Sequence, residues 1–285
     1  PEHREEGGTP DILGSIRAGL AFGLKQAVGT DHILRREHLF TQRALAAWRV
    51  HPNLHVLGNL DVERLSILSF RVRVGEGFLH HEFVMALLND LFGIQARSGC
   101  SCAGPYGHRL LGIDPAHSTQ FEAAILQGWH GLKPGWARLG FNYFFSETVV
   151  NHVIAAVLWI AEQGWRLLPA YRFDPTTGHW THRTLPPQPR ASLHDLRFAA
   201  EGGTPVPALK TAPEAVLAGY LEKAPRAVAA LHQQLETAAP NFSTDPPIAH
   251  EAAHLRWFPL PSEAALAQQA GEGALAFNLP AQPSE

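Results

Sequence analysis

Residues 66–74 read Ser66-Ile67-Leu68-Ser69-Phe70-Arg71-Val72-Arg73-Val74, and the fold of the chain is first visible in this stretch. Apolar and polar residues alternate along it, which is typical of a strand with one buried face. Residues 78–92 then place Phe78, Met85, Leu88 and Phe92 at helical intervals, and Gly93 follows as a stop signal. We therefore expect a strand and a helix in succession, with a second short strand over residues 94–97.

Helices and strands continue to alternate on both sides of this stretch. Asp11 or Thr9 is positioned to cap the first helix, Thr30 or Asp31 the second, and Ser146 the last. This order predicts an α/β or α+β fold, in which a small mixed sheet is covered by helices. The elements expected there are helices over residues 11–28, 30–49, 115–132 and 147–164, strands over 54–57 and 136–143, and a hairpin over 171–180.

The composition changes after residue 185. Prolines at 186, 187 and 189 predict a linker, and residues 213–237 form an Ala-rich segment that we expect to be one helix broken at Pro225. The tail from Pro240 is rich in Pro, Ala and Gly and is expected to be only partly ordered. We therefore divide the chain into a unit of residues 1–183 and a C-terminal extension of residues 184–285.

The overall composition excludes two classes of partner. Hydrophobic residues make up 45% of the chain and charged residues 17%, with a net charge of −3, so no basic surface for nucleic acid is expected. No apolar run reaches the roughly 18–20 residues of a membrane span. Two cysteines one residue apart are a poor disulfide framework, which favours the reducing cytoplasm.

Both cysteines lie in the segment 97–105, which contains Arg97, Gly99, Cys100, Cys102 and Pro105. Glycine allows the backbone to approach a ligand closely, and a neighbouring arginine favours a thiolate or holds a carboxylate. A structural role as small buried residues is an equal alternative. A metal site on Cys100, Cys102 and His108 is a weaker one, because the spacing matches no common zinc motif.

Three segments, taken in order, resemble the class-V aminotransferases, and among them the cysteine desulfurases and selenocysteine lyases. Glu6-Gly7-Gly8-Thr9-Pro10 is similar to a Glu-x-Gly-Thr-Pro segment of the family. Arg97, Gly99, Cys102, Ala103 and Pro105 match its loop around a reactive cysteine. Arg138, Tyr143 and Glu147 are similar to its closing element.

The resemblance implies the small, C-terminal domain of a fold type I enzyme that uses pyridoxal 5′-phosphate (PLP) and acts on an amino acid. It implies that Gly8 and Thr9, in the interface segment 5–30, contact the cofactor phosphate of the other subunit of a homodimer. Arg138, with Arg97 as a helper, would bind the substrate carboxylate. Cys102 would attack the substrate sulfur as a thiolate.

Two departures from the family pattern limit these expectations. Cys100 and Ser101 stand where desulfurases of this type commonly have two histidines, which puts the role of Cys102 in doubt. The family's PLP-binding lysine belongs to a preceding domain, and no lysine of this chain has its sequence context. The resemblance therefore predicts a C-terminal portion that is inactive alone. The alternative is a non-catalytic module for dimerisation or partner binding.

Overall fold

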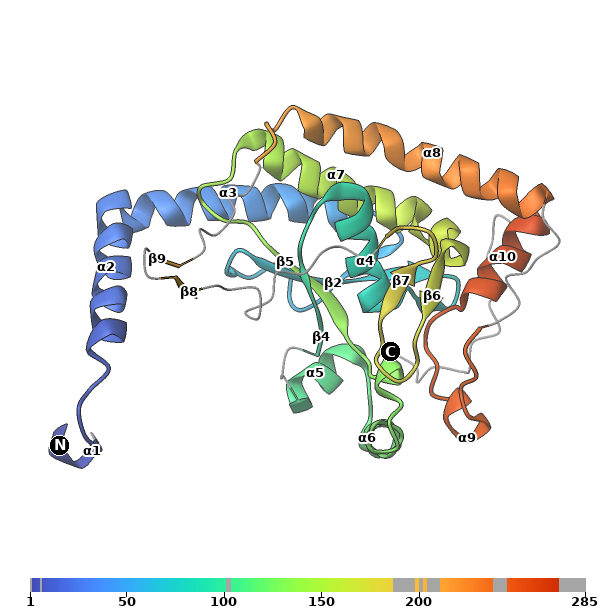
Figure 1. Ribbon diagram of the computed structural model, residues 1–285, viewed down its shortest axis with the longest axis horizontal. Helices are drawn as coiled ribbons and strands as arrows, with labels where there is room; N and C mark the ends of the chain where they lie inside the picture. Colours follow the sequence, from blue (N-terminus) through green and yellow to red (C-terminus); the bar gives the residue numbers. More distant parts are fainter. Residues whose placement is uncertain are drawn as a thin grey trace.

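The computed structural model describes residues 2–5, 7–100, 104–186, 198–199, 202–203, 211–237 and 245–271 (Figure 1). Its elements are, in chain order, α1 (Glu2–Glu5), α2 (Ile12–Val28), α3 (Thr30–Trp48), β1 (Leu54–Val56), β2 (Ile67–Val74), β3 (Gly77–Phe78), α4 (His81–Phe92), β4 (Arg97–Gly99), α5 (Gly104–Leu111), α6 (Pro115–Leu126), the 3-10 helix η1 (His130–Leu132), β5 (Trp136–Gly140), α7 (Glu147–Gln163), the 3-10 helix η2 (Gly164–Ala170), β6 (Tyr171–Phe173), β7 (Trp180–His182), β8 (Phe198–Ala199), β9 (Gly202–Gly203), α8 (Val216–Thr237), α9 (His250–Ala253) and α10 (Pro261–Gln269). None of the described helices is long and apolar enough to cross a membrane.

The main sheet has the strand order β1-β2-β5-β4, with β3 paired to β2. Every pairing in it is antiparallel, so the expected mixture of strand directions is wrong, whereas the expected combination of helices and a small sheet is confirmed. The alternation along β2 buries Leu68, Phe70 and Val72 on one face of the sheet. Trp48 of α3 packs on that face, with its ring centroid 5.3 Å from that of Phe70.

The capping residues explain where several helices begin and end. The side chains of Asp11 and Ser146 accept hydrogen bonds from backbone N–H groups in the first turns of α2 and α7, as predicted. Gly93 ends α4 in the left-handed conformation (φ 66°) that glycine adopts without strain. Thr30 instead lies inside α3, whose N-cap is Gly29 without a side-chain hydrogen bond.

Four predicted boundaries differ from the structure. The helix expected from Phe78 begins only at His81, because Phe78 pairs with Arg73 in β3. The strand expected over 94–97 is β4, three residues later. The helix expected over 115–132 divides into α6 and η1, and the strand expected over 136–143 ends at Gly140. Helix α5 was not predicted.

The C-terminal segments pack into the same hydrophobic core as the sheet. Helix α8 continues through Pro225, because burial of Leu231 and Leu235 on one of its faces holds it against the core. Trp257 and Phe258 are also buried, so residues 245–271 are more ordered than predicted. The predicted linker and residues 238–244 and 272–285 lie outside the described residues, except for Pro186 at the start of the linker. The division at residue 183 stays a prediction.

His80 and His81 are buried where the chain enters α4. The ring of His80 stacks on Trp257 with a centroid distance of 5.3 Å, and its Nε2 lies 3.0 Å from the carbonyl oxygen of Gly131. Its Nδ1 accepts a hydrogen bond from the backbone N–H of Glu82, which leaves Nε2 as the donor. Burial, and then the neighbouring His81, lower the pKa of His80.

The lowered pKa predicts that the protein loses stability in mild acid. An unfolded histidine titrates at its ordinary value of 6.5, so below that pH the unfolded chain binds more protons than the folded one. Between pH 7.5 and pH 5 the free energy of unfolding should fall by up to about 2 kcal/mol for this histidine. Urea denaturation at both pH values measures the difference. His80→Asn, which preserves a capping side chain, should reduce this difference in the free energy of unfolding. His32→Asn, at an exposed position, should leave the difference unchanged. An unchanged pH dependence in His80→Asn would contradict the assignment.

Candidate functional site

Arg97 and Arg138 lie directly opposite one another on neighbouring strands. They are register partners in the β4–β5 pair, and Arg138 is also opposite Ser69 of β2. Partners in an antiparallel pair project to the same face of the sheet. Neither guanidinium forms an ion pair or a hydrogen bond with another residue in the described part of the chain. Two adjacent cations without a counter-charge favour binding of an anion, and guanidinium groups match a carboxylate or a phosphate well.

The two arginines line one cavity of about 690 Å³. The rest of its wall comes from the start of β2, from the end of α4 and the segment that follows it, from the end of β5 and the loop after it, and from α7 and α8. These parts contribute mainly apolar side chains, among them Phe92, Leu139, Phe145, Val153 and Leu217.

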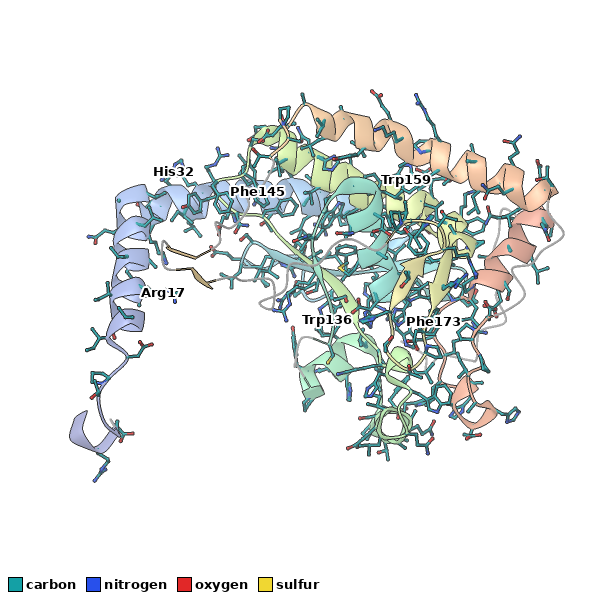
Figure 2. The ribbon with its side chains drawn as sticks, in the orientation of Figure 1. Arg17, His32, Trp136, Phe145, Trp159 and Phe173 are labelled. Atoms are coloured by element: carbon teal, nitrogen blue, oxygen red, sulfur yellow. The ribbon has the colours of Figure 1, made fainter. Side chains whose placement is uncertain are left out.

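The loop between β5 and α7 is held in place by α3. Nε of Arg36 donates to the carbonyl oxygen of Tyr143 at 2.7 Å, and Nη2 donates to that of Phe145 at 2.8 Å. Figure 2 shows Phe145 over α3, near the start of α7. Two hydrogen bonds from the guanidinium of Arg36 therefore hold the loop that forms this part of the cavity wall.

His152 of α7 adds an unsatisfied polar atom to the cavity wall. Its side chain is 5% exposed, and its Nε2 lies 3.0 Å from the carbonyl oxygen of Phe92, to which it donates. The other ring nitrogen, Nδ1, is buried without a hydrogen-bond partner among the described residues. A buried acceptor of this kind is usually satisfied by a ligand or water.

Asp90, an acidic residue of α4, does not pair with Arg97. Its carboxylate instead accepts a hydrogen bond of 3.0 Å from the hydroxyl of Tyr171. Burial, and then the Asp90 carboxylate, raise the pKa of Tyr171, so this pair stays a neutral donor on a charged acceptor. Arg97 therefore remains available to the cavity.

Gly8 and Thr9 lie away from the arginine cavity. They are exposed residues just before α2, which buries no residue and projects from the body of the protein (Figure 1). Arg17, in the first half of this helix, marks its separation from the sheet (Figure 2). Because Asp11 caps α2, the hydroxyl of Thr9 is not used as a cap. A single chain thus does not bring Thr9 to Arg138.

The cysteine loop is described only up to its first cysteine. Cys100 is half-buried after β4, and Cys102 lies outside the described residues. Within the residues that are described, no three His, Cys, Asp or Glu side chains are grouped in a way that would hold a metal ion. The roles of Cys102 and of the other predicted site residues stay predictions.

Sequence reasoning missed His152 and Leu217 as parts of the cavity. His152 lies on the apolar helix α7, where a histidine has no local signal of its own. Leu217 lies in the C-terminal extension, more than seventy residues after β5. Only the packing of α8 against α4 and α7 brings it to the cavity.

Part of the chain is similar in sequence to known proteins. Residues 1–119 match the family model of aminotransferase class-V. The chain is 33% identical to a cysteine desulfurase of Dickeya dadantii over 105 residues. This aligned segment makes up 37% of this chain and 24% of that protein. A probable cysteine desulfurase of Streptomyces coelicolor is 32% identical over 104 residues, 36% of this chain and 24% of that protein. The chain thus spans about a quarter of the length of these relatives.

A solved structure is also similar. The apo structure of a cysteine desulfurase from Thermococcus onnurineus NA1 aligns with 56% of this chain and 34% of its own, at 25% identity and a TM-score of 0.44. The residues that match the family model include Gly8, Thr9, Arg97 and Cys102, whereas Arg138 follows them. Residues 1–119 are therefore similar to the class-V aminotransferase family, and cysteine desulfurases are among the proteins that the chain resembles.

Proposed function

We propose that this chain is the C-terminal part of a PLP-dependent enzyme of class V that acts on an amino acid, and that it holds the substrate carboxylate between Arg97 and Arg138. The observation that supports this most strongly is the register of β4 and β5, which places both arginines on one face of the sheet, where both residues line one cavity. Side-by-side guanidinium groups orient a carboxylate by more than one hydrogen bond. Such a clamp fixes the substrate relative to the reacting atoms.

The residues present fit only part of a PLP site. PLP supplies an electron sink for bonds at the α-carbon of an amino acid when it is bound. Gly8 and Thr9 offer backbone and hydroxyl donors for its phosphate, and both are exposed at the base of an arm that buries nothing in its own chain. We propose that they serve a site completed by another subunit of a homodimer. The arginine cavity would lie on the substrate side of such a site.

Cys102 is our candidate for a sulfur acceptor, by analogy with the relatives named cysteine desulfurase. Attack on sulfur needs a thiolate, and Arg97, five residues earlier, supplies a positive charge that favours one. The reducing cytoplasm suits a free thiol. Alkylation of Cys102 would abolish sulfide release by a desulfurase and would matter little to an aminotransferase.

A non-catalytic dimerisation or partner-binding module is the second candidate function. It is favoured by α2, where Ile12, Leu13, Ile16, Leu20 and Leu24 are all exposed. An exposed apolar stripe of this size is uncommon on a protein surface that has no partner.

Complementation separates the two candidates. The chain is mixed with the remaining N-terminal part of the Dickeya dadantii relative, PLP, L-cysteine and dithiothreitol, which reduces a persulfide to sulfide, and sulfide and alanine are measured. The enzyme proposal expects turnover that depends on Arg138, with the Arg73→Gln variant as a control on the same sheet face. Co-elution of the two parts without turnover would favour the module.

A further inference from the structure

We infer that the arginine cavity takes a carboxylate with a large apolar body, and that Leu217 of the C-terminal helix α8 limits the length of that body. This inference rests on the proposed function, since the two arginines must bind the carboxylate. The inference goes beyond the proposed function because it assigns a substrate class and a specificity-determining residue. That residue lies outside the segment that matches the family model.

The size and lining of the cavity support an apolar ligand body. A cavity of about 690 Å³ lies within the range of roughly 300–1,000 Å³ that holds a sizeable organic ligand. The charged groups in its lining are the two arginines, and Phe92, Phe145 and Val153 contribute apolar surface. A small amino acid such as cysteine can reach the two arginines but would leave most of this surface without a partner, so a larger apolar carboxylate should bind more tightly. Burying a larger apolar group there is favourable by about 25 cal/mol for each Å² removed from water.

Leu217 is fixed at the cavity by the start of α8. Its backbone N–H donates to the carbonyl oxygen of Glu214 at 3.0 Å. The Glu214 carboxylate in turn accepts a hydrogen bond of 2.5 Å from the hydroxyl of Ser146. Ser146 is the N-cap of α7, the helix that supplies Val153 to the same cavity. The wall formed by Leu217 is therefore attached to α7, which also lines the cavity.

A second contact holds α8 one turn further along. The ring of Tyr220 lies 6.2 Å from that of His152, between ring centroids, and it also approaches Gly93 at the end of α4. His152 and Gly93 both line the cavity. Because Leu217 and Tyr220 are three residues apart, they lie on the same face of α8. This face of α8 closes the cavity, so a larger side chain at position 217 would shorten the space available to the ligand.

Binding of three probes to the full 285-residue chain tests the inference. The probes are 3-phenylpropionate, acetate and the uncharged 3-phenylpropan-1-ol, and their dissociation constants are measured by ligand-observed NMR. We expect 3-phenylpropionate to bind at least about tenfold more tightly than either of the others, because only it uses both the arginines and the apolar wall. Equal binding of acetate and 3-phenylpropionate would overturn the apolar part of the inference.

Leu217→Trp should weaken 3-phenylpropionate by about tenfold or more and leave acetate within about twofold. The matched control is Leu221→Trp, at another half-buried leucine of α8 that does not line the cavity. Unchanged binding of 3-phenylpropionate to Leu217→Trp, with binding still lost in Arg138→Gln, would overturn the role of Leu217 and leave the proposed function standing. Binding that survives in Arg138→Gln would instead refute the proposed function. Leu217→Ala, which enlarges the cavity, gives a second variant should the tryptophan variant not fold.

Discussion

Replacement of Arg138 by glutamine is expected to weaken carboxylate binding to this chain by about a hundredfold. Hydrogen bonds to charged groups contribute roughly 1.5–3 kcal/mol, and about 2.7 kcal/mol corresponds to a factor of one hundred. The effect should exceed that of Arg97→Gln, because Arg138 is half-buried on an inner strand and Arg97 is exposed at the sheet edge. In the complemented enzyme, the same change should lower kcat/KM for the amino acid by a similar factor. Calorimetric titration with 3-phenylpropionate measures the first effect.

Arg73→Gln is the matched control for Arg138→Gln. Arg73 also lies on a strand of the main sheet, where its guanidinium stacks over Phe78 with a distance of 5.1 Å to the ring centroid, and it does not line the cavity. Its loss should change the dissociation constant by less than about twofold. Equal weakening by both changes would mean that the general positive charge of the sheet, and not a defined clamp, attracts the anion.

Gly135→Ala is expected to destabilise the fold by about 2–4 kcal/mol. A Cβ atom at this position would lie 2.7 Å from the Cα atom of Gly99 and 2.7 Å from Cδ2 of His81. The first contact is with backbone, which cannot move aside as the end of a flexible side chain would. Because Gly99 is the register partner of Trp136 in β4–β5, the displacement should also separate Arg97 from Arg138. Urea denaturation and carboxylate titration measure the two consequences.

Gly219→Ala provides the control for this change. Gly219 lies inside α8, and a Cβ atom there would have no neighbour within 4 Å. Alanine is favoured over glycine in a helix by about 1 kcal/mol, so this variant should be slightly stabilised. If Gly135→Ala proved equally harmless, the close approach of β4 and residue 135 would not exist as described.

Local signals in the sequence were sufficient for most helix and strand positions. Ser146, Asp11 and Gly93 each mark a helix end through a hydrogen bond or backbone conformation that involves only neighbouring residues. The alternation from residue 66 to residue 74 identified the central strand for the same reason. The start of α4 was misplaced because pairing with Arg73, a tertiary contact, turns Phe78 into a strand residue.

Long-range packing determined what the sequence could not reveal. The burial of His80 depends on Trp257, which is 177 residues away and stacks on its ring. The C-terminal extension looked separate because its Pro- and Ala-rich composition hides the few residues, such as Trp257 and Leu217, that contact the main body. Arg97 and Arg138 were both predicted as carboxylate ligands, but only the β4–β5 register makes them neighbours. Composition and motif order carry no information on register.

The central claim is that Arg97 and Arg138 form one anion site, and the guanidinium signals of the two residues test it most directly. In an NMR titration of the full chain with 3-phenylpropionate, the Nε–Hε resonances of both arginines should shift with one common dissociation constant. The resonance of Arg73 should stay in place. Shifts of Arg97 and Arg138 that follow different dissociation constants, or a shift of only one of them, would contradict the claim.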